Sequence, residues 1–94
     1  MIIIPNEYID LIIKVLEWHK TEYRTEIDFQ IVLKRILERM YYYKETKKEY
    51  FLENNEAYYI KECFSDAKNY YPYSRELVKD IYDWIYAEYI NTKK

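Results

Sequence analysis

The chain of 94 residues contains no glycine and only two prolines. Tight β-hairpin turns usually place glycine where the backbone needs a positive φ, so a fold built from many hairpins is not expected. Any turn that does need a positive φ is expected to fall to asparagine. The glycine-rich loops that cradle phosphates in nucleotide-binding enzymes are absent for the same reason. An all-α fold is compatible with these absences.

Histidine and cysteine occur once each, as His19 and Cys63. A lone cysteine cannot staple the fold, and no Cys/His cluster has zinc-ligand spacing. His19 lies in an apolar helical pattern and is expected to be a half-buried, hydrogen-bonded imidazole; the alternative is a general base or metal ligand acting with Glu22. Cys63 is expected to be a small buried side chain. We therefore expect a protein that is not an enzyme and that needs no metal or other cofactor.

The N-terminal sequence MIIIPNEYIDLII lacks a basic segment ahead of its apolar run, and polar residues interrupt that run from position 6. This pattern is typical neither of a signal peptide nor of a membrane span. The net charge of −2 argues against a chain that binds polyanions as a whole. We expect a cytoplasmic protein, in the host cytoplasm if the gene is viral.

Half of the residues are hydrophobic and 20% are aromatic, including 14 tyrosines. This composition is too apolar for a disordered chain, and the length fits one domain, residues 1–94. Isoleucine, tyrosine, lysine and asparagine, whose codons are rich in A and T, dominate the chain. An A/T-rich genome is thereby indicated, and a viral or mobile-element origin is one interpretation of it.

Apolar residues recur at helical spacing in four segments, which predicts an all-α fold. The predicted architecture is a compact bundle of four helices at about 6–22, 25–53, 55–71 and 74–90. Residues of N-cap type stand near the predicted starts, and they are Asn6, Thr25, Asn54 or Asn55, and Ser74. The first helix is apolar over most of its circumference, which is typical of a helix at the centre of a bundle or of one that also meets another subunit.

The second helix is predicted to be the longest, because its apolar stripe keeps its phase across the polar stretch 44–49. The stepping that ends at Tyr43 continues to Lys47 and Tyr50, with Phe51 beside them. A helix over 25–53 would overhang its neighbours and leave this seam to be covered by the third helix or by a second subunit. The alternative is an α+β fold in which residues 48–62 form a β-hairpin.

Tyrosines on predicted outer helix faces indicate a protein-binding surface. Tyr42, Tyr58 and Tyr86 project outward from their helices, and tyrosine is enriched at protein interfaces. A lysine in a core heptad position, as at Lys47, can fix the register and oligomeric state of a helix pair. The predicted partner-binding residues are Tyr42, Lys47, Tyr50, Phe51, Tyr58 and Tyr86.

Residues 34–48 carry six basic and two acidic side chains, so this segment is positive in a chain that is negative overall. Arg35 and Arg39 are predicted to project from one side of the helix, where they can contact phosphates. The other interpretation is an ordinary solvated helix face. The predicted nucleic-acid residues are Lys34, Arg35, Arg39, Lys44 and Lys48.

These patterns favour a small non-enzymatic interaction protein that docks a tyrosine-rich helical surface onto a protein partner or onto itself as a homodimer. A viral or mobile-element accessory protein that binds or inhibits a host protein is one version of this role. The alternative is a DNA- or RNA-binding regulator that uses the basic face of residues 34–48.

Overall fold

The computed structural model describes residues 2–23 and 26–92. Most of these residues lie in four α-helices: α1 (Asn6–Trp18), α2 (Ile27–Thr46), α3 (Asn54–Tyr70) and α4 (Arg75–Thr92). A π-helix, η1 (His19–Tyr23), continues α1, and two short strands, β1 (Ile2–Ile3) and β2 (Phe51–Leu52), pair with each other. The predicted all-α bundle with α2 as its longest helix is confirmed.

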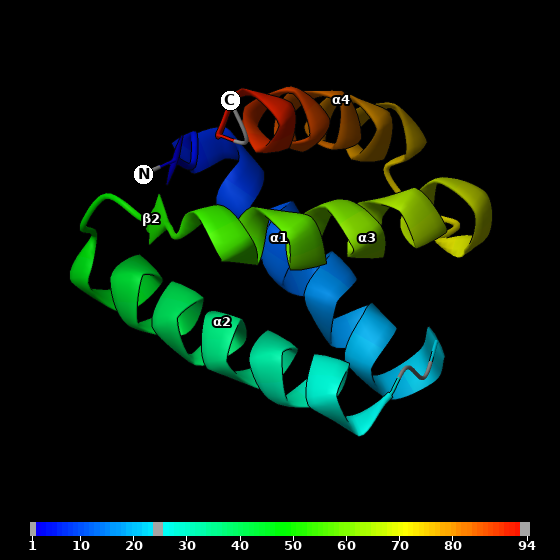
Figure 1. Ribbon diagram of the computed structural model, residues 1–94, viewed down its shortest axis with the longest axis horizontal. Helices are drawn as coiled ribbons and strands as arrows, with labels where there is room; N and C mark the ends of the chain where they lie inside the picture. Colours follow the sequence, from blue (N-terminus) through cyan, green and yellow to red (C-terminus); the bar gives the residue numbers. More distant parts are fainter. Residues whose placement is uncertain (1, 24–25, 93–94) are drawn as a thin grey trace.

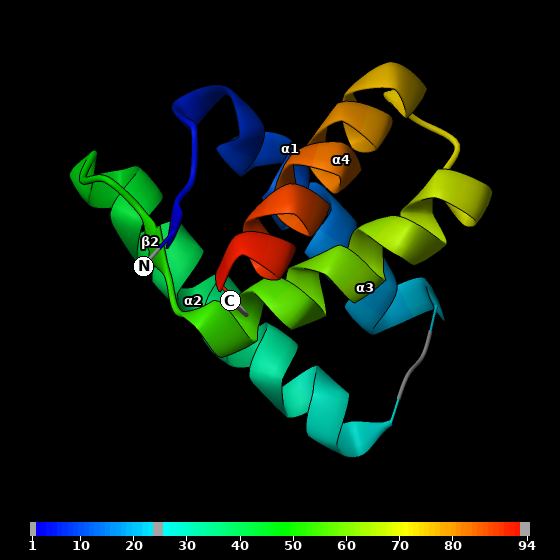
Figure 2. The same cartoon turned by 45° about the horizontal axis from the view of Figure 1, so that its top comes forward.

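The helices pack in two layers. Figure 1 shows α4, α3 and α2 following one another across the molecule, while α1 crosses behind α3. The chain direction reverses between α3 and α4, and these antiparallel helices make the most extensive pairing in the fold. Figure 2 shows the same α3–α4 pair from a tilted direction, with α1 passing beneath it.

The predicted central helix is α1. Leu11, Ile12 and Ile13 are buried, as are Val15 and Leu16, so that somewhat more than half of its circumference faces other elements. It packs against both α2 and α3. Its apolar sequence is therefore accounted for within one chain, without a second subunit.

The predicted apolar stripes of the other helices also face the core. The fully or nearly fully buried members are Leu33, Ile36 and Met40 of α2, Ala57, Ile60, Phe64 and Ala67 of α3, and Val78, Ile81 and Ile85 of α4. Burial of such side chains typically stabilises a fold by about 1.5–3 kcal/mol each. Helical periodicity was thus a sound guide to the core within each of these helices, in α2 as far as Met40.

The prediction that the second helix continues to residue 53 is wrong. α2 ends at Thr46, and Lys47 adopts a left-handed conformation with φ 55° and ψ 33°. Its N–H donates to the Tyr43 carbonyl, as in a helix C-cap. The chain then turns and carries Tyr50 into the core, where its side chain is fully buried. The overhanging seam does not exist, and the argument for a dimer built on it fails.

The alternative of a β-hairpin over residues 48–62 is wrong as well. Phe51 and Leu52 do form a strand, but they pair with Ile3 and Ile2 of the N-terminal strand. The Ile4 N–H extends this ladder by donating to the Tyr50 carbonyl at 3.1 Å. Residues 54–62 belong to α3. The partner of this strand is thus distant in sequence. Hairpin signals, which depend on neighbouring residues, cannot predict such a pairing.

The helix starts depart from the predicted caps in detail. Thr25 lies outside the described residues, and α2 begins at Ile27. Glu53, rather than Asn54 or Asn55, is the N-cap of α3, and its N–H donates to Glu56 Oε1 at 2.8 Å.

Two residues of the described chain have a positive φ, and neither is the asparagine expected from sequence. They are Lys47 and Ser74, the second of which has φ 52° immediately before α4. At the other side of that turn, Tyr71 is extended, as is usual before a proline, and ends α3.

Candidate functional site

The lone histidine is part of the interior. His19 is fully buried, and its Nε2 lies 2.8 Å from Asp66 Oδ2. The rings of Tyr23 and Phe29 flank it with centroids at 4.8 and 5.5 Å. Its Nδ1 has no hydrogen-bond partner. These contacts give His19 a place in the packing between η1 and α3, and they do not include Glu22.

Cys63 is buried on α3. Burial raises the pKa of its thiol well above the ordinary value, and the carboxylates of Asp66 and Glu62 act in the same direction. A thiol in this setting stays protonated near neutral pH and is a poor nucleophile. Within the described part of the chain, no group of three or more His, Cys, Asp and Glu side chains is arranged to hold a metal ion.

Tyrosines and cations share an exposed or half-buried surface along the antiparallel pair α3 and α4. We call it the tyrosine–cation face. At 100° per residue, its members fall within about 80° on each helix. They are Tyr58, Lys61 and Lys68 of α3, and Arg75, Lys79, Tyr82, Tyr86 and Tyr89 of α4.

Contacts between the two helices organise this face. Lys61 Nζ lies 5.3 Å from the ring centroids of both Tyr58 and Tyr89. Lys68 Nζ lies 3.9 Å from the centroid of Tyr82. Such cation–π contacts are favourable even at exposed sites. They hold long side chains in place, so the face is partly ordered before any ligand arrives.

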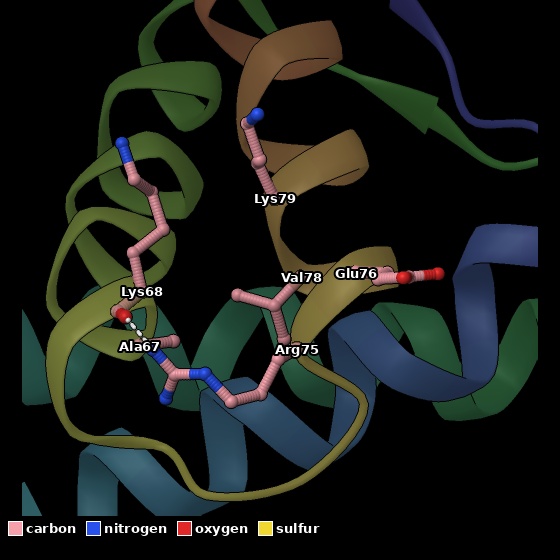
Figure 3. A pocket seen from close by; sticks show the side chains of 6 residues that line it. All are labelled: Ala67, Lys68, Arg75, Glu76, Val78 and Lys79. Carbon is pink, nitrogen blue, oxygen red and sulfur yellow. Dashed lines mark hydrogen bonds between the residues drawn. The ribbon is translucent and has the colours of Figure 1, made fainter.

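A pocket of about 330 Å³ opens at one end of the face, between the last residues of α3 and the first residues of α4. Buried Ala67 and Val78 form its apolar floor. Figure 3 shows Lys68 and Lys79 rising from opposite helices on its two sides, while the Glu76 carboxylate is turned away from Lys68. Two ammonium groups around an apolar floor suit a ligand that carries negative charge next to apolar surface.

Arg75 fixes the geometry of this pocket. Its guanidinium donates to the Lys68 carbonyl at 2.9 Å and to the Tyr71 carbonyl at 3.2 Å. These carbonyls belong to the end of α3, where a helix lacks intrahelical donors and where its dipole favours a cation. Arg75 therefore ties the start of α4 to the end of α3.

The predicted partner-binding residues do not share one location. Tyr58 and Tyr86 are exposed and both belong to the tyrosine–cation face. Tyr42 and Lys47 are exposed on and just beyond α2, away from it. Phe51 is half-buried in β2. Tyr50 is fully buried, so its predicted position in an open seam is wrong.

The predicted basic face on α2 is divided by internal contacts. Arg39 does not project freely, because it donates to the carboxylate of Glu56 and to the Phe51 carbonyl. Lys44 Nζ lies 2.8 Å from Asp10 Oδ1, which lowers the pKa of Asp10 and raises that of Lys44.

The other basic residues predicted to contact nucleic acid, Lys34, Arg35 and Lys48, are exposed. With Arg39 and Lys44 held by carboxylates, the phosphate-binding row predicted on α2 is interrupted.

Tyr58 and Tyr86 of the tyrosine–cation face were predicted from the sequence, but its cations and the tyrosines Tyr82 and Tyr89 were overlooked, although α4 carries a signal for its own members. Lys79, Tyr82, Tyr86 and Tyr89 follow the spacing of one helix face. Their counterparts on α3 become part of the same surface only because the two helices pack antiparallel. That juxtaposition has no signature in a linear pattern.

Comparison of the chain with protein-family models, with curated proteins and with solved structures found no match.

No helix among residues 2–23 and 26–92 is both long and apolar enough to cross a membrane.

Proposed function

We propose that the protein is a small non-enzymatic interaction module whose tyrosine–cation face binds an acidic segment of a protein partner. The observation that carries this proposal is the charge pattern of the face. It gathers four cations and no acidic residue among its eight members. Of the carboxylates on its edge, Glu62 is already bonded to Lys61 at 3.0 Å, while Glu76 and Asp83 are exposed on α4. In a chain with a net charge of −2, this face is a local reversal of sign.

The tyrosines supply the contact area. Tyr58 is 41% and Tyr86 44% exposed, and neither is needed to fill the core. Tyrosine offers a large ring and one polar hydroxyl at low conformational cost, which is why it is common at protein interfaces. Complementary charge chiefly raises the association rate and excludes wrong partners. An acidic segment would therefore place carboxylates near Lys68 and Lys79 and apolar atoms against the rings.

A protein partner fits this face better than a second copy of the chain. A twofold dimer places the same patch against itself, which would bring four cations opposite four others. Single-stranded nucleic acid is the second candidate, because bases stack on tyrosine beside cations. Here, however, the rings of Tyr58, Tyr82 and Tyr89 already carry lysine ammonium groups. The pI of about 5.5 also differs from the basic character of most such binders.

If the A/T-rich codon preference reflects a viral or mobile-element gene, the acidic segment would belong to a host protein. Binding would then act by occupying a surface that the host protein needs.

The test uses a fluorescently labelled decaglutamate peptide at low salt, with anisotropy and ¹⁵N chemical shifts as readouts. We expect shifts confined to α3 and α4, and binding that weakens with added salt. Lys79→Glu is expected to weaken binding at least about fivefold, because it replaces an attraction by a repulsion. The matched control is Lys34→Glu, an equal charge reversal on exposed α2.

Equal losses in the two variants, or no binding of decaglutamate at low salt, would contradict the proposed face. Tighter binding of an oligothymidylate than of the peptide would replace the protein partner by single-stranded nucleic acid. Decalysine serves as the charge-reversed probe and is expected not to bind to this face.

A further inference from the structure

A second hollow, separate from the tyrosine–cation face, lies where the end of α1 meets the turn between α3 and α4. Its volume is about 410 Å³. Figures 1 and 2 show these two segments at the same end of the molecule. The lining combines aromatic rings with carboxylates, and its principal members are Trp18, Tyr41, Tyr71, Tyr73, Glu17 and Glu22.

Three of the rings meet at steep angles. Trp18 and Tyr71 have centroids 5.4 Å apart and an interplanar angle of 71°. Tyr71 and Tyr73 are 5.5 Å apart at 75°. Rings arranged in this way form the walls of a corner, whereas a parallel stack would leave one flat surface. Tyr71 is only 8% exposed and forms the base of the corner, while Tyr73 is 66% exposed and forms an open wall.

Packing against η1 fixes the position of Trp18 in this corner. Trp18 contacts the rings of His19 and Tyr23 at 5.9 and 5.6 Å. These two residues belong to the π-helix η1, a rare element that is frequent at functional sites. The partly buried bond between His19 and Asp66 joins η1 to α3. The Trp18 wall is therefore fixed by packing rather than by a ligand.

The charges at the hollow are mainly negative. Glu17 and Glu22 line it, and Lys14 is the one cation among its described lining residues. The Tyr41 hydroxyl lies 3.5 Å from Glu17 Oε1 and can donate to it, and both residues line the hollow. Ring faces carry the negative end of the aromatic quadrupole, so rings and carboxylates favour the same kind of ligand.

We propose that this aromatic corner, formed by Trp18, Tyr71 and Tyr73 with Glu17 and Glu22 at its edge, binds an organic ammonium ion. The chemical class is a methylated or quaternary ammonium, either a small molecule or a methylated lysine side chain. A plain lysine ammonium is strongly hydrated and resists removal from water, whereas methyl groups lower that cost and fit the aromatic walls. Tryptophan is the best of the aromatic rings for this contact.

The test is a titration with tetramethylammonium, followed through the indole N–H resonances of the two tryptophans. The Trp18 signal is expected to shift. Trp84, which packs against Tyr8 at 5.5 Å, is the internal reference and is expected to stay in place. Neopentyl alcohol is the matched neutral ligand, with similar shape and no charge. We expect it to bind at least about tenfold more weakly, since cation–π attraction is lost.

Variants separate the ring contribution from general apolar contact. Tyr73→Leu keeps an apolar side chain but removes an exposed ring, and it is expected to weaken tetramethylammonium binding by about tenfold. Tyr42→Leu makes the same change at an exposed tyrosine outside the hollow, and it is expected to leave binding unchanged. Glu22→Gln is expected to weaken binding by about two- to threefold, because the carboxylate is solvated.

Equal binding of the neutral ligand, or an unmoved Trp18 resonance, would overturn the proposal. Two further arms identify the source of the cation. Tighter binding of a trimethyllysine peptide than of choline would support a modified protein as the ligand, and the reverse order would support a small molecule. Neither result depends on decaglutamate binding to the tyrosine–cation face, so each of the two proposed sites is tested independently of the other.

Discussion

Tyr50 illustrates how the environment of one residue can reverse its role. Its sequence position suggested an exposed seam, yet its side chain is fully buried and its hydroxyl has no hydrogen-bond partner. Its ring meets Tyr43 edge to face at 5.1 Å, and the Arg39 guanidinium lies 5.7 Å from its centroid. Burial, reinforced by the Glu56 carboxylate, raises the pKa of Tyr50 far above its usual value. The folded state therefore favours the neutral phenol of Tyr50 over the phenolate.

This environment predicts how Tyr50→Phe changes stability with pH. Near neutral pH the variant is expected to match the parent or gain up to about 1 kcal/mol, because it removes an unsatisfied buried hydroxyl. The raised pKa means that the stabilising effect of the neutral phenol is complete below pH 10. It is lost as pH rises above 10, where an unfolded tyrosine ionises. Urea unfolding between pH 7 and 11 should therefore show a shallower alkaline decline for the variant.

Tyr50→Leu, which also lacks the hydroxyl but leaves a smaller side chain, serves as the packing control. A loss of more than about 1 kcal/mol for Tyr50→Phe at pH 7 would show that the hydroxyl makes a favourable bond.

At the scale of an element, the end of α2 shows local helix propensity being overridden. Residues 44–49 are mostly good helix formers, and the apolar stepping continues through them in phase. The chain nevertheless turns at Lys47 in a left-handed conformation that is costly for a residue with a Cβ. Burial of Tyr50 and pairing of β2 with β1 offset that cost. Tertiary contacts decided where this helix ends.

Lys47→Gly tests the left-handed turn directly. The substitution is expected to stabilise the protein by about 0.5–1 kcal/mol, because a left-handed residue with a Cβ costs about 1–2 kcal/mol and the freedom of glycine in the unfolded chain offsets part of the gain. Lys48→Gly is the matched control, since Lys48 has no positive φ and should gain nothing. Chemical denaturation measures both. If α2 instead continued through residue 47, Lys47→Gly would cost about 1 kcal/mol.

At the scale of the whole molecule, the long helix fits the fold. Twenty residues of α2 span about 30 Å, and the Cα atoms of the protein extend over 29 × 27 × 26 Å. No part of α2 extends as an arm. The N-terminal strand closes the end of the bundle near Tyr50, with Ile2 and Ile4 buried and Ile3 exposed.

The N-terminal strand offers a test with its own control. Ile4→Ala is expected to destabilise the protein by about 2–4 kcal/mol, because it opens a cavity in the core. Ile3→Ala removes the same atoms from the adjacent residue, whose side chain is 52% exposed, and should cost less than about 1 kcal/mol. Thermal and urea unfolding of both variants measure the difference. Equal effects would show that the strand does not dock as described.

The sequence by itself determined the helical class, the four helices and most of the core. Helical periodicity is a local property, and burial of one stripe on each helix follows from it, as Leu33, Ile60 and Ile81 show. The same local character accounts for the error after Thr46, because phase along the chain carries no information about which surface a segment will meet. The absence of glycine indicated few turns but not that Lys47 and Ser74 would adopt positive φ.

Only the tertiary structure decided the two candidate binding surfaces. The tyrosine–cation face exists because α3 and α4 pack antiparallel, which brings Lys61 between Tyr58 and Tyr89. The aromatic corner exists because the turn after α3 returns Tyr71 and Tyr73 to the end of α1. Both surfaces join residues that are far apart in the chain. Side chains gathered by packing have no fixed spacing in sequence, and for this physical reason the sequence alone could not reveal them.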